Sequence, residues 1–172
     1  MEVQHPDHSK PLYIATQIND VHIRRAQVDT STSLNLIPAS TFKAAGIPLS
    51  RIAGAPIEVF GFAGIHECTI GSIQLVIKVG PTVALTRFHV IDSPVSYHAL
   101  LGRPWLHKHK LVPSTYHQCV KGRFSGKPIR IPANPTPFDL SEAHYFEATF
   151  YDQLTLSGED STSRPVGIPL PS

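Results

Sequence analysis

Apolar and polar residues follow one another along the start of the chain in a pattern that predicts β-strands. Residues 11–18 are rich in β-branched and aromatic side chains, and residues 21–28 alternate apolar with polar positions. Alternation of this kind is expected for a strand that buries one face. Asn19 and Asp20 stand between the two stretches and form a turn signal. We therefore predict a β-hairpin whose second strand ends at Asp29.

The elements after this hairpin are short. Residues 34–37 predict a third strand that Pro38 ends, and residues 38–46 predict one or two helical turns. Ser40 is of a type that caps a helix, and Gly46 stands where a helix is expected to stop.

Strand patterns then recur at a spacing of about ten residues, separated by glycine or proline breaks. They cover residues 57–60, 66–71, 73–79, 83–85, 87–91 and 99–102. This spacing favours a closed barrel or a sandwich over alternating strands and helices. Residues 103–110 predict a short helix, because Pro104 lies near its start and cations lie near its end. The fold class is therefore all-β with one or two short helices.

The character of the chain changes beyond Val112. Residues 115–120 and 128–132 predict two strands on either side of the stretch from Gly122 to Gly126. A proline-rich break follows, and the last part of the chain is rich in Ser, Pro and Gly. We expect a flexible arm over 1–10, one domain over 11–131, and a tail over 132–172 that is partly helical and then disordered.

Composition limits the function classes. The chain has 172 residues, of which 41% are hydrophobic and 16% charged, so it can build its own core. A formal net charge of +2 gives no electrostatic case for nucleic acid or a membrane surface as a partner. The sequence contains no apolar run of the ~20 residues that a membrane helix needs and no apolar signal core. We expect an intracellular protein, cytoplasmic or nuclear, with Cys68 and Cys119 as reduced thiols.

The most informative polar residue is Asp29, which follows an apolar strand and precedes a run of small hydroxyl residues. A carboxylate is costly to desolvate, so its presence at this point needs a reason. One interpretation is a turn aspartate that accepts hydrogen bonds from backbone N–H groups. The other is one half of a site that needs two carboxylates.

A second group of polar residues consists of His107, His109, His117 and Cys119, whose types suit a zinc site. The alternative is a solvated basic helix next to a strand edge, because residues two apart on a helix point in different directions. We expect no metal and no cofactor. Glu58 and Glu67 are expected to be exposed.

Three motifs occur in order: Val28-Asp29-Thr30, the glycine-bracketed stretch 61–64, and the run from Leu100 to Leu106. Together they resemble the retropepsin-like aspartic proteases, and most of all the protease segment of plant Ty3/gypsy-type retrotransposon polyproteins. The resemblance covers roughly residues 11–110. It implies a closed, barrel-like all-β fold that works as a symmetric homodimer on extended peptide or polyprotein substrates.

The resemblance also implies roles for individual residues. Asp29 matches the catalytic aspartate, of which each subunit supplies one, and Thr30 matches the residue that braces the two aspartate loops across the dimer axis. Two further elements match the mobile flap over the substrate and the hydrophobic element packed beneath the aspartate loop. Their residues are Gly61, Phe62, Ala63 and Gly64 for the flap, and Leu100, Leu101 and Gly102 for the packed element.

Ser31 departs from the family pattern, which has glycine at this position. A serine adds a Cβ atom and a hydroxyl group that could hydrogen-bond Asp29, and both features work against a carboxylate pair that shares one proton. Three hypotheses follow. The chain is an aspartic endopeptidase with a loose preference for large hydrophobic residues, or a catalytically impaired protease-derived module that dimerises or binds peptides, or a zinc-binding module.

Overall fold

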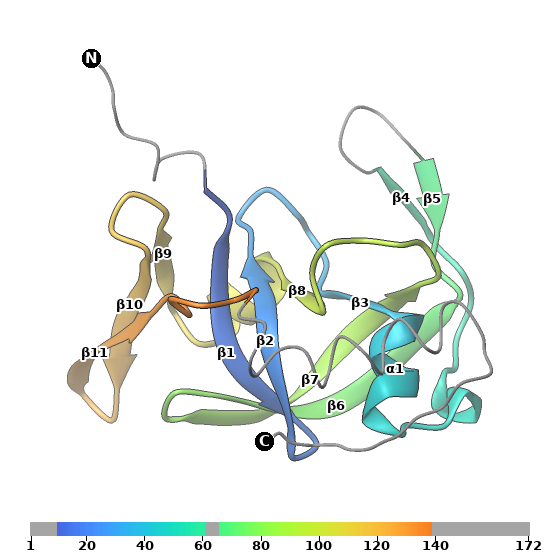
Figure 1. The fold of residues 1–172 in the computed structure, drawn as a ribbon, viewed down its shortest axis with the longest axis horizontal. Helices are drawn as coiled ribbons and strands as arrows, with labels where there is room; N and C mark the ends of the chain where they lie inside the picture. Colours follow the sequence, from blue (N-terminus) through green and yellow to red (C-terminus); the bar gives the residue numbers. More distant parts are fainter. Residues whose placement is uncertain (1–9, 61–65, 139–172) are drawn as a thin grey trace.

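The chain forms a closed barrel with small β-sheets attached to it (Figure 1). The structure is a computed structural model and describes residues 10–60 and 66–138. Six strands close the barrel in the order β1-β2-β8-β3-β7-β6. Their bounds are Leu12–Ile18 (β1), Val21–Val28 (β2), Leu36–Pro38 (β3), Gly71–Val79 (β6), Thr82–Ile91 (β7) and Ala99–Leu101 (β8).

The remaining elements lie around the barrel. They are the helices α1 (Ala39–Ala45) and α2 (Arg103–Lys108), a 3-10 turn (Leu49–Arg51), the ribbon β4 (Glu58–Phe60) with β5 (His66–Cys68), and a sheet of β9 (Val112–Ser114), β10 (Cys119–Phe124) and β11 (Lys127–Pro132). The predicted fold class, an all-β barrel with short helices, is confirmed.

The predicted first hairpin is present, and its turn explains its register. β1 pairs antiparallel with β2, with Ile18 opposite Val21. Asn19 and Asp20 both have positive φ angles, of 47° and 72°. Tight hairpin turns require this conformation, and Asn and Asp tolerate it better than most residues. The hairpin brings the end of β2, and with it Asp29, to the rim of the barrel.

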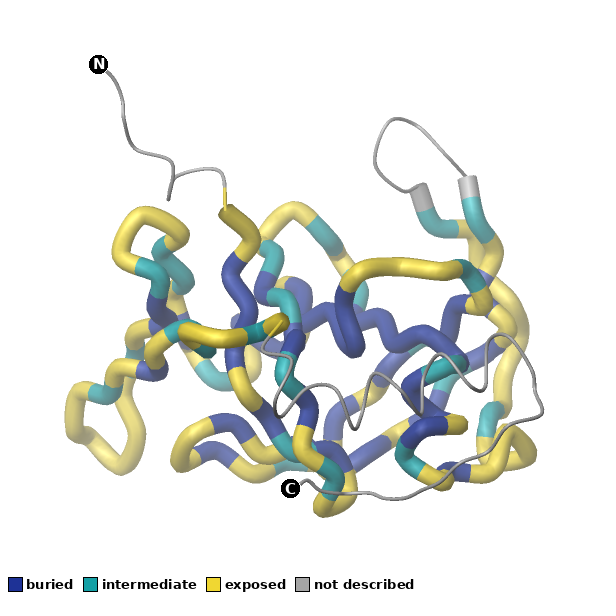
Figure 2. Tube along the Cα trace, in the orientation of Figure 1, coloured by how far each residue is buried: buried dark blue, intermediate teal, exposed yellow. Residues whose placement is uncertain are grey.

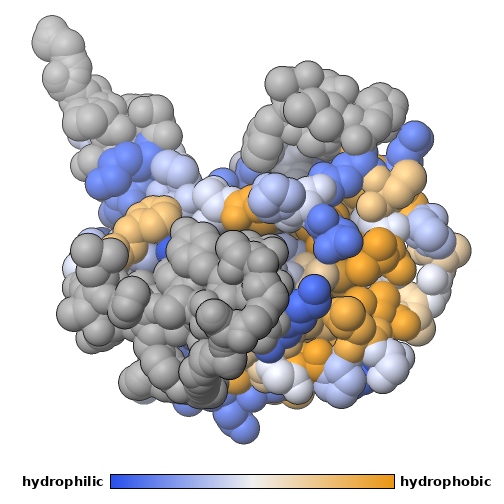
Figure 3. All heavy atoms as spheres, turned by 45° about the vertical axis from the view of Figure 1, so that its right-hand side comes forward, coloured by the Kyte–Doolittle hydropathy of each residue, from blue (hydrophilic) through white to orange (hydrophobic). Residues whose placement is uncertain are grey.

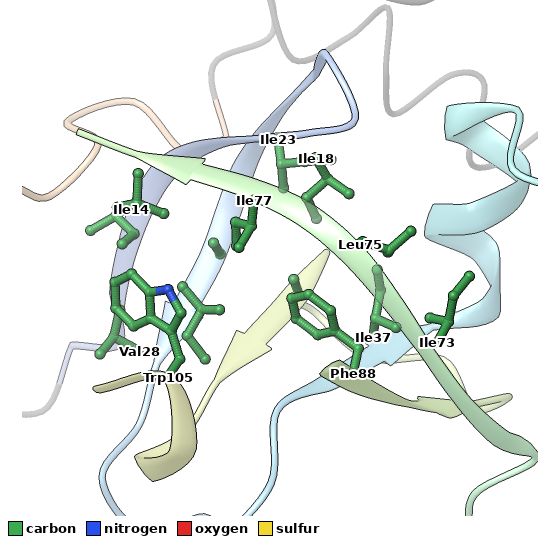
Figure 4. Close-up of a cluster of buried hydrophobic side chains, with 14 of the residues drawn as sticks. Ile14, Ile18, Ile23, Val28, Ile37, Ile73, Leu75, Ile77, Phe88 and Trp105 are labelled. Atoms are coloured by element: carbon green, nitrogen blue, oxygen red, sulfur yellow. The ribbon is translucent and has the colours of Figure 1, made fainter. Parts of the chain in front are cut away.

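The core fills the barrel with aliphatic and aromatic side chains (Figure 4). Ile14, Ile37 and Phe88 are fully buried, and Trp105 of α2 is 1% exposed. Buried residues follow the strands, whereas exposed residues lie mainly in the turns and loops around them (Figure 2). The alternation along β6 illustrates this, because every second residue from Gly71 to Val79 is buried.

Three local predictions are wrong. Ser40 does not cap α1, because the helix begins one residue earlier and Pro38 occupies the cap position without a side-chain hydrogen bond. The third strand covers Leu36–Pro38 instead of residues 34–37, so it starts two residues later than predicted and includes Pro38. Residues 115–118 form a turn rather than a strand, and Gly122 lies inside β10, so the tight turn is at Ser125 and Gly126. The predicted helix stop at Gly46 is confirmed, with a φ of 73°.

The segment 133–138 lies across the first hairpin (Figure 1). The backbone N–H of Asn134 donates to the carbonyl of Tyr13 at 2.8 Å, and its side-chain amide donates to the carbonyl of Arg24 at 3.1 Å. The guanidinium carbon of Arg25 lies 4.2 Å from the ring centroid of Phe138. These contacts hold the segment against the barrel at the strands that carry Asp29.

Candidate active site

The position of Asp29 follows from how β8 is inserted into the sheet. β8 pairs parallel with β2, with Val28 opposite Leu101, and antiparallel with β3, with Leu36 opposite Leu100. The backbone N–H of Asp29 continues this pairing by donating to the carbonyl of Leu101 at 3.1 Å. The loop that starts at Asp29 is therefore fixed against the end of β8.

Gly102 allows this loop to come close to β8. A Cβ atom added at Gly102 would lie 2.3 Å from the carbonyl oxygen of Leu34 and 2.7 Å from the Cγ2 atom of Thr32. The φ angle of Gly102 is −94°, so the glycine is needed for space and not for its conformation. The residues predicted beneath the aspartate loop, Leu100, Leu101 and Gly102, are buried, and the loop contacts the last two of them.

Asn35 is a site residue that the sequence analysis missed. Its side chain is 5% exposed, its Oδ1 atom accepts from the N–H of Gly102 at 2.9 Å, and its Nδ2 atom donates to the carbonyl of Arg87 at 3.1 Å. These bonds fix the loop to β7 and β8 at once. A polar residue between Leu34 and Leu36 was the available signal, because a buried amide must find partners.

Ser31 makes the most direct contact with Asp29. The backbone N–H and the hydroxyl of Ser31 both donate to Oδ1 of Asp29, at 2.9 Å and 2.6 Å. Asp29 is half-buried, whereas Thr30 and Ser31 are exposed. The carbonyl of Thr30 accepts a hydrogen bond from Nη1 of Arg103 at 2.9 Å, which ties the loop to α2. The expected hydrogen bond between the serine hydroxyl and the carboxylate is present.

Asp29 faces a cleft of about 570 Å³. Its lining is largely apolar and includes the carboxylates of Glu58 and Glu67 from the β4–β5 ribbon. The apolar lining consists of Leu34, Leu36, Val59, Ile91, Val95 and Leu100. Glu58 is exposed as expected, but Glu67 is half-buried, because Ser93 donates a hydrogen bond to its Oε2 atom. Apolar residues also gather on the side of the molecule that lies at the right of Figure 1 (Figure 3).

Tyr97 lies in the same cleft and is 8% exposed. Burial raises the pKa of Tyr97 to about 12, with smaller contributions from the negative charges of Glu67 and Asp29. The phenol therefore stays protonated at every pH at which the protein is expected to work. It is a hydrogen-bond donor beside two carboxylates.

The predicted flap residues, Gly61, Phe62, Ala63 and Gly64, lie outside the described residues. The two strands on either side of them are described. β4 and β5 pair antiparallel, with Val59 opposite Glu67.

The residues considered for zinc do not come together as a ligand set. In the described parts of the chain, no group of three or more His, Cys, Asp or Glu side chains could hold a metal ion. The His109 ring packs against Trp105 with 5.4 Å between ring centroids, and burial together with Lys108 lowers the pKa of His109. His117 contacts Ser114 through its Nδ1 atom, and Cys119 is buried.

Both cysteines are free thiols. Among the described residues, no helix is long and apolar enough to cross a membrane.

Comparison of the structure with solved structures finds proteins of one fold. The retroviral protease-like domain of Ddi1 from Leishmania major matches with a TM-score of 0.55 and 19% identity, over 73% of this chain and 97% of that domain. The EIAV protease complexed with the inhibitor HBY-793 matches with a TM-score of 0.46 and 23% identity, over 62% of this chain and 93% of that one. A retropepsin-like aspartic protease from Rickettsia conorii matches with a TM-score of 0.45 and 20% identity, over 59% of this chain and 75% of that one.

The sequence itself matches no family model and no curated protein. The likeness to solved structures is therefore a likeness of fold. The described part of this chain has a retropepsin-like fold.

Proposed function

We propose that this chain is an aspartic endopeptidase of the retropepsin type that acts as a homodimer on extended peptides. The placement of Asp29 carries the proposal. The side chain directly follows β2, on a loop held by β8, and faces a cleft of about 570 Å³. A turn aspartate with a purely local role needs neither the cleft nor the glycine beneath it.

Peptide hydrolysis without a metal needs a base to activate water and an acid to protonate the carbonyl oxygen. Two carboxyl groups that share one proton supply both, because like charges about 3 Å apart do not both ionise; aspartic proteases are the standard example of this behaviour. The titration then belongs to the pair and not to either residue. Asp29 supplies one carboxyl group of the pair.

The second carboxyl group would come from another copy of the chain. A two-fold axis near Asp29 would place two identical loops face to face, and an isologous contact of this kind is the usual way to form a dimer. Thr30 is exposed next to Asp29 and would brace the two loops across the axis. Residues 61–64 would close over a substrate that pairs with the β4–β5 ribbon.

The order of the three sequence motifs supports an origin in a plant Ty3/gypsy-type retrotransposon polyprotein. The run from Leu100 to Leu106 forms β8 and the start of α2, which places its glycine beneath the aspartate loop. In that setting the substrate would be a polyprotein.

A second candidate is a protease-derived module that has lost catalysis and serves as a dimerising or peptide-binding domain. The hydroxyl of Ser31 favours it, because it donates to Asp29 at 2.6 Å in addition to the backbone N–H. Two donors on one oxygen stabilise the charged carboxylate, whereas the pair must hold a proton.

Replacing Ser31 by glycine is expected to raise the cleavage rate by about tenfold, because it removes one charge-assisted hydrogen bond from Asp29. The measurement is the hydrolysis of an unstructured protein at about pH 5–6, followed by gel and mass spectrometry. Ser31→Ala separates the hydroxyl from the Cβ atom, and Ser50→Ala, at an exposed serine outside the cleft, is a matched control. Equal rates for the parent chain and Ser31→Gly would show that Ser31 does not limit catalysis.

Cleavage by the parent chain in the same assay, together with a dimer in sedimentation, tests the first proposal. A protein that stays monomeric at high concentration would contradict the endopeptidase and also the dimerising form of the second candidate.

A further inference from the structure

Two carboxylates in the cleft have no basic partner among the described residues. Asp29 accepts hydrogen bonds from Ser31, and Glu67 accepts one from Ser93. The described residues that line the cleft include a third carboxylate, Glu58, and no lysine, arginine or histidine. Half-buried negative charges without a cation are unfavourable, and low-dielectric walls concentrate their potential in the cleft. The cleft is therefore suited to a ligand that carries a positive charge.

The rest of the lining defines the shape of that ligand. Leu34, Leu36 and Leu100 form an apolar surface next to Asp29, and Ile91 and Val95 extend it. A lysine or arginine side chain combines an apolar stem with a cationic end, and it buries the stem on apolar surface while the charge meets a polar group. A small metal ion or a purely apolar side chain would use only one of these two features.

Tyr97 supplies an independent observation. Its side chain is more than nine-tenths buried and lines the cleft, and its hydroxyl has no hydrogen-bond partner within the described residues. The residues on either side hold it in place, because Nε of Arg25 donates to the carbonyl of Ser96 at 2.7 Å and the N–H of His98 donates to the carbonyl of Arg25 at 2.9 Å. A phenol hydroxyl in the wall of the cleft can donate to a ligand there, and a peptide carbonyl is a suitable acceptor.

We propose that the cleft selects extended peptides that carry a lysine or arginine. This basic residue flanks the peptide residues that lie at Asp29, and Glu67 is the residue that determines the specificity. The cation of the peptide pairs with the Glu67 carboxylate, and the Tyr97 hydroxyl donates to a backbone carbonyl of the peptide. This inference rests on the proposed function, since the peptide occupies the same cleft. It refines the expected preference for large hydrophobic residues by adding one basic position.

The test compares the binding of fluorescent peptides to the Asp29→Asn variant, which leaves them intact. The peptides are about ten residues long, contain a central Leu-Phe pair, and differ by lysine or methionine at one flanking position at a time. Methionine matches the stem of lysine without its charge. At one of these positions we expect the lysine peptide to bind about tenfold more tightly than the methionine peptide. This ratio of the two affinities should fall as salt is added.

In an Asp29→Asn background, Glu67→Gln is expected to reduce that ratio to about one, because it removes the charge and keeps the acceptor for Ser93. Asp20→Asn is the matched control, since Asp20 lies in the turn at the opposite end of β2, and it should leave the ratio unchanged. Tyr97→Phe should weaken both peptides by the same factor, because its contact is to the backbone.

Equal binding of all the peptides, or a lysine preference that Glu67→Gln retains, would overturn the inference. Peptides that do not bind at all would also overturn it. Cleavage of an unstructured protein by the parent chain, measured separately, decides whether the proposed function fails together with the inference or stands without it.

Discussion

Replacing Asp29 by asparagine is expected to abolish peptide cleavage. In the proposed pair, one carboxyl group must ionise to act as the base and the other must carry the shared proton, and an amide can do neither. Loss of a residue that acts as part of a catalytic unit lowers the rate by about a thousandfold or more. The measurement is the hydrolysis of an unstructured protein at about pH 5–6.

The fold should tolerate this change. The asparagine Oδ1 atom can accept the same two hydrogen bonds from Ser31 that Asp29 accepts. Urea unfolding should therefore be almost unchanged, and Asp20→Asn should keep full activity. Equal cleavage by Asp29→Asn and the parent chain would show that the activity comes from another site or another protein.

Replacing Gly102 by alanine is expected to destabilise the protein by about 3 kcal/mol and to displace the aspartate loop. The added Cβ atom would lie 2.3 Å from the carbonyl oxygen of Leu34 and 2.9 Å from that of Thr32, and backbone atoms cannot turn away as a side chain can. The hydrogen bond from Gly102 to Asn35 would be disturbed at the same time. The free energy of unfolding is measured by urea titration.

Gly122→Ala is a suitable control for this variant. A Cβ atom at Gly122 would first meet the Cδ2 atom of Leu111, at 2.5 Å, and that side chain can change its rotamer. The cost should be smaller, and the cleavage activity should be retained. An unfolding free energy for Gly102→Ala equal to that of the parent chain would contradict the close packing of the loop on β8.

The parts of the fold that could be predicted are those with a local signal. An alternation broken only at Arg24-Arg25 marked β2, the Asn19-Asp20 turn set its pairing with β1 next to the turn, and Gly46 marked the end of α1. The position of Asp29 at the end of β2 followed from the same alternation. Each of these depends on neighbouring residues, which a sequence displays directly.

The parts that could not be predicted depend on contacts between distant segments. The β8 strand lies between β2 and β3, so Asn35 bonds to Gly102, which is 67 residues away. Asn134 bonds to Tyr13 and to Arg24, which is 110 residues away. Glu67 was expected to be exposed, but it is half-buried, lines the cleft and accepts a hydrogen bond from Ser93, which is 26 residues away.

The central claim is that each chain carries one half of the catalytic pair. The most direct measurement mixes the parent chain with Asp29→Asn at a fixed total concentration and lets the subunits exchange before cleavage is assayed. The account predicts that the rate follows the square of the parent fraction, so that an equal mixture retains about one quarter of the activity. A rate that falls in direct proportion to the parent fraction, with one half retained in an equal mixture, would mean that each chain holds a complete site and would contradict the account.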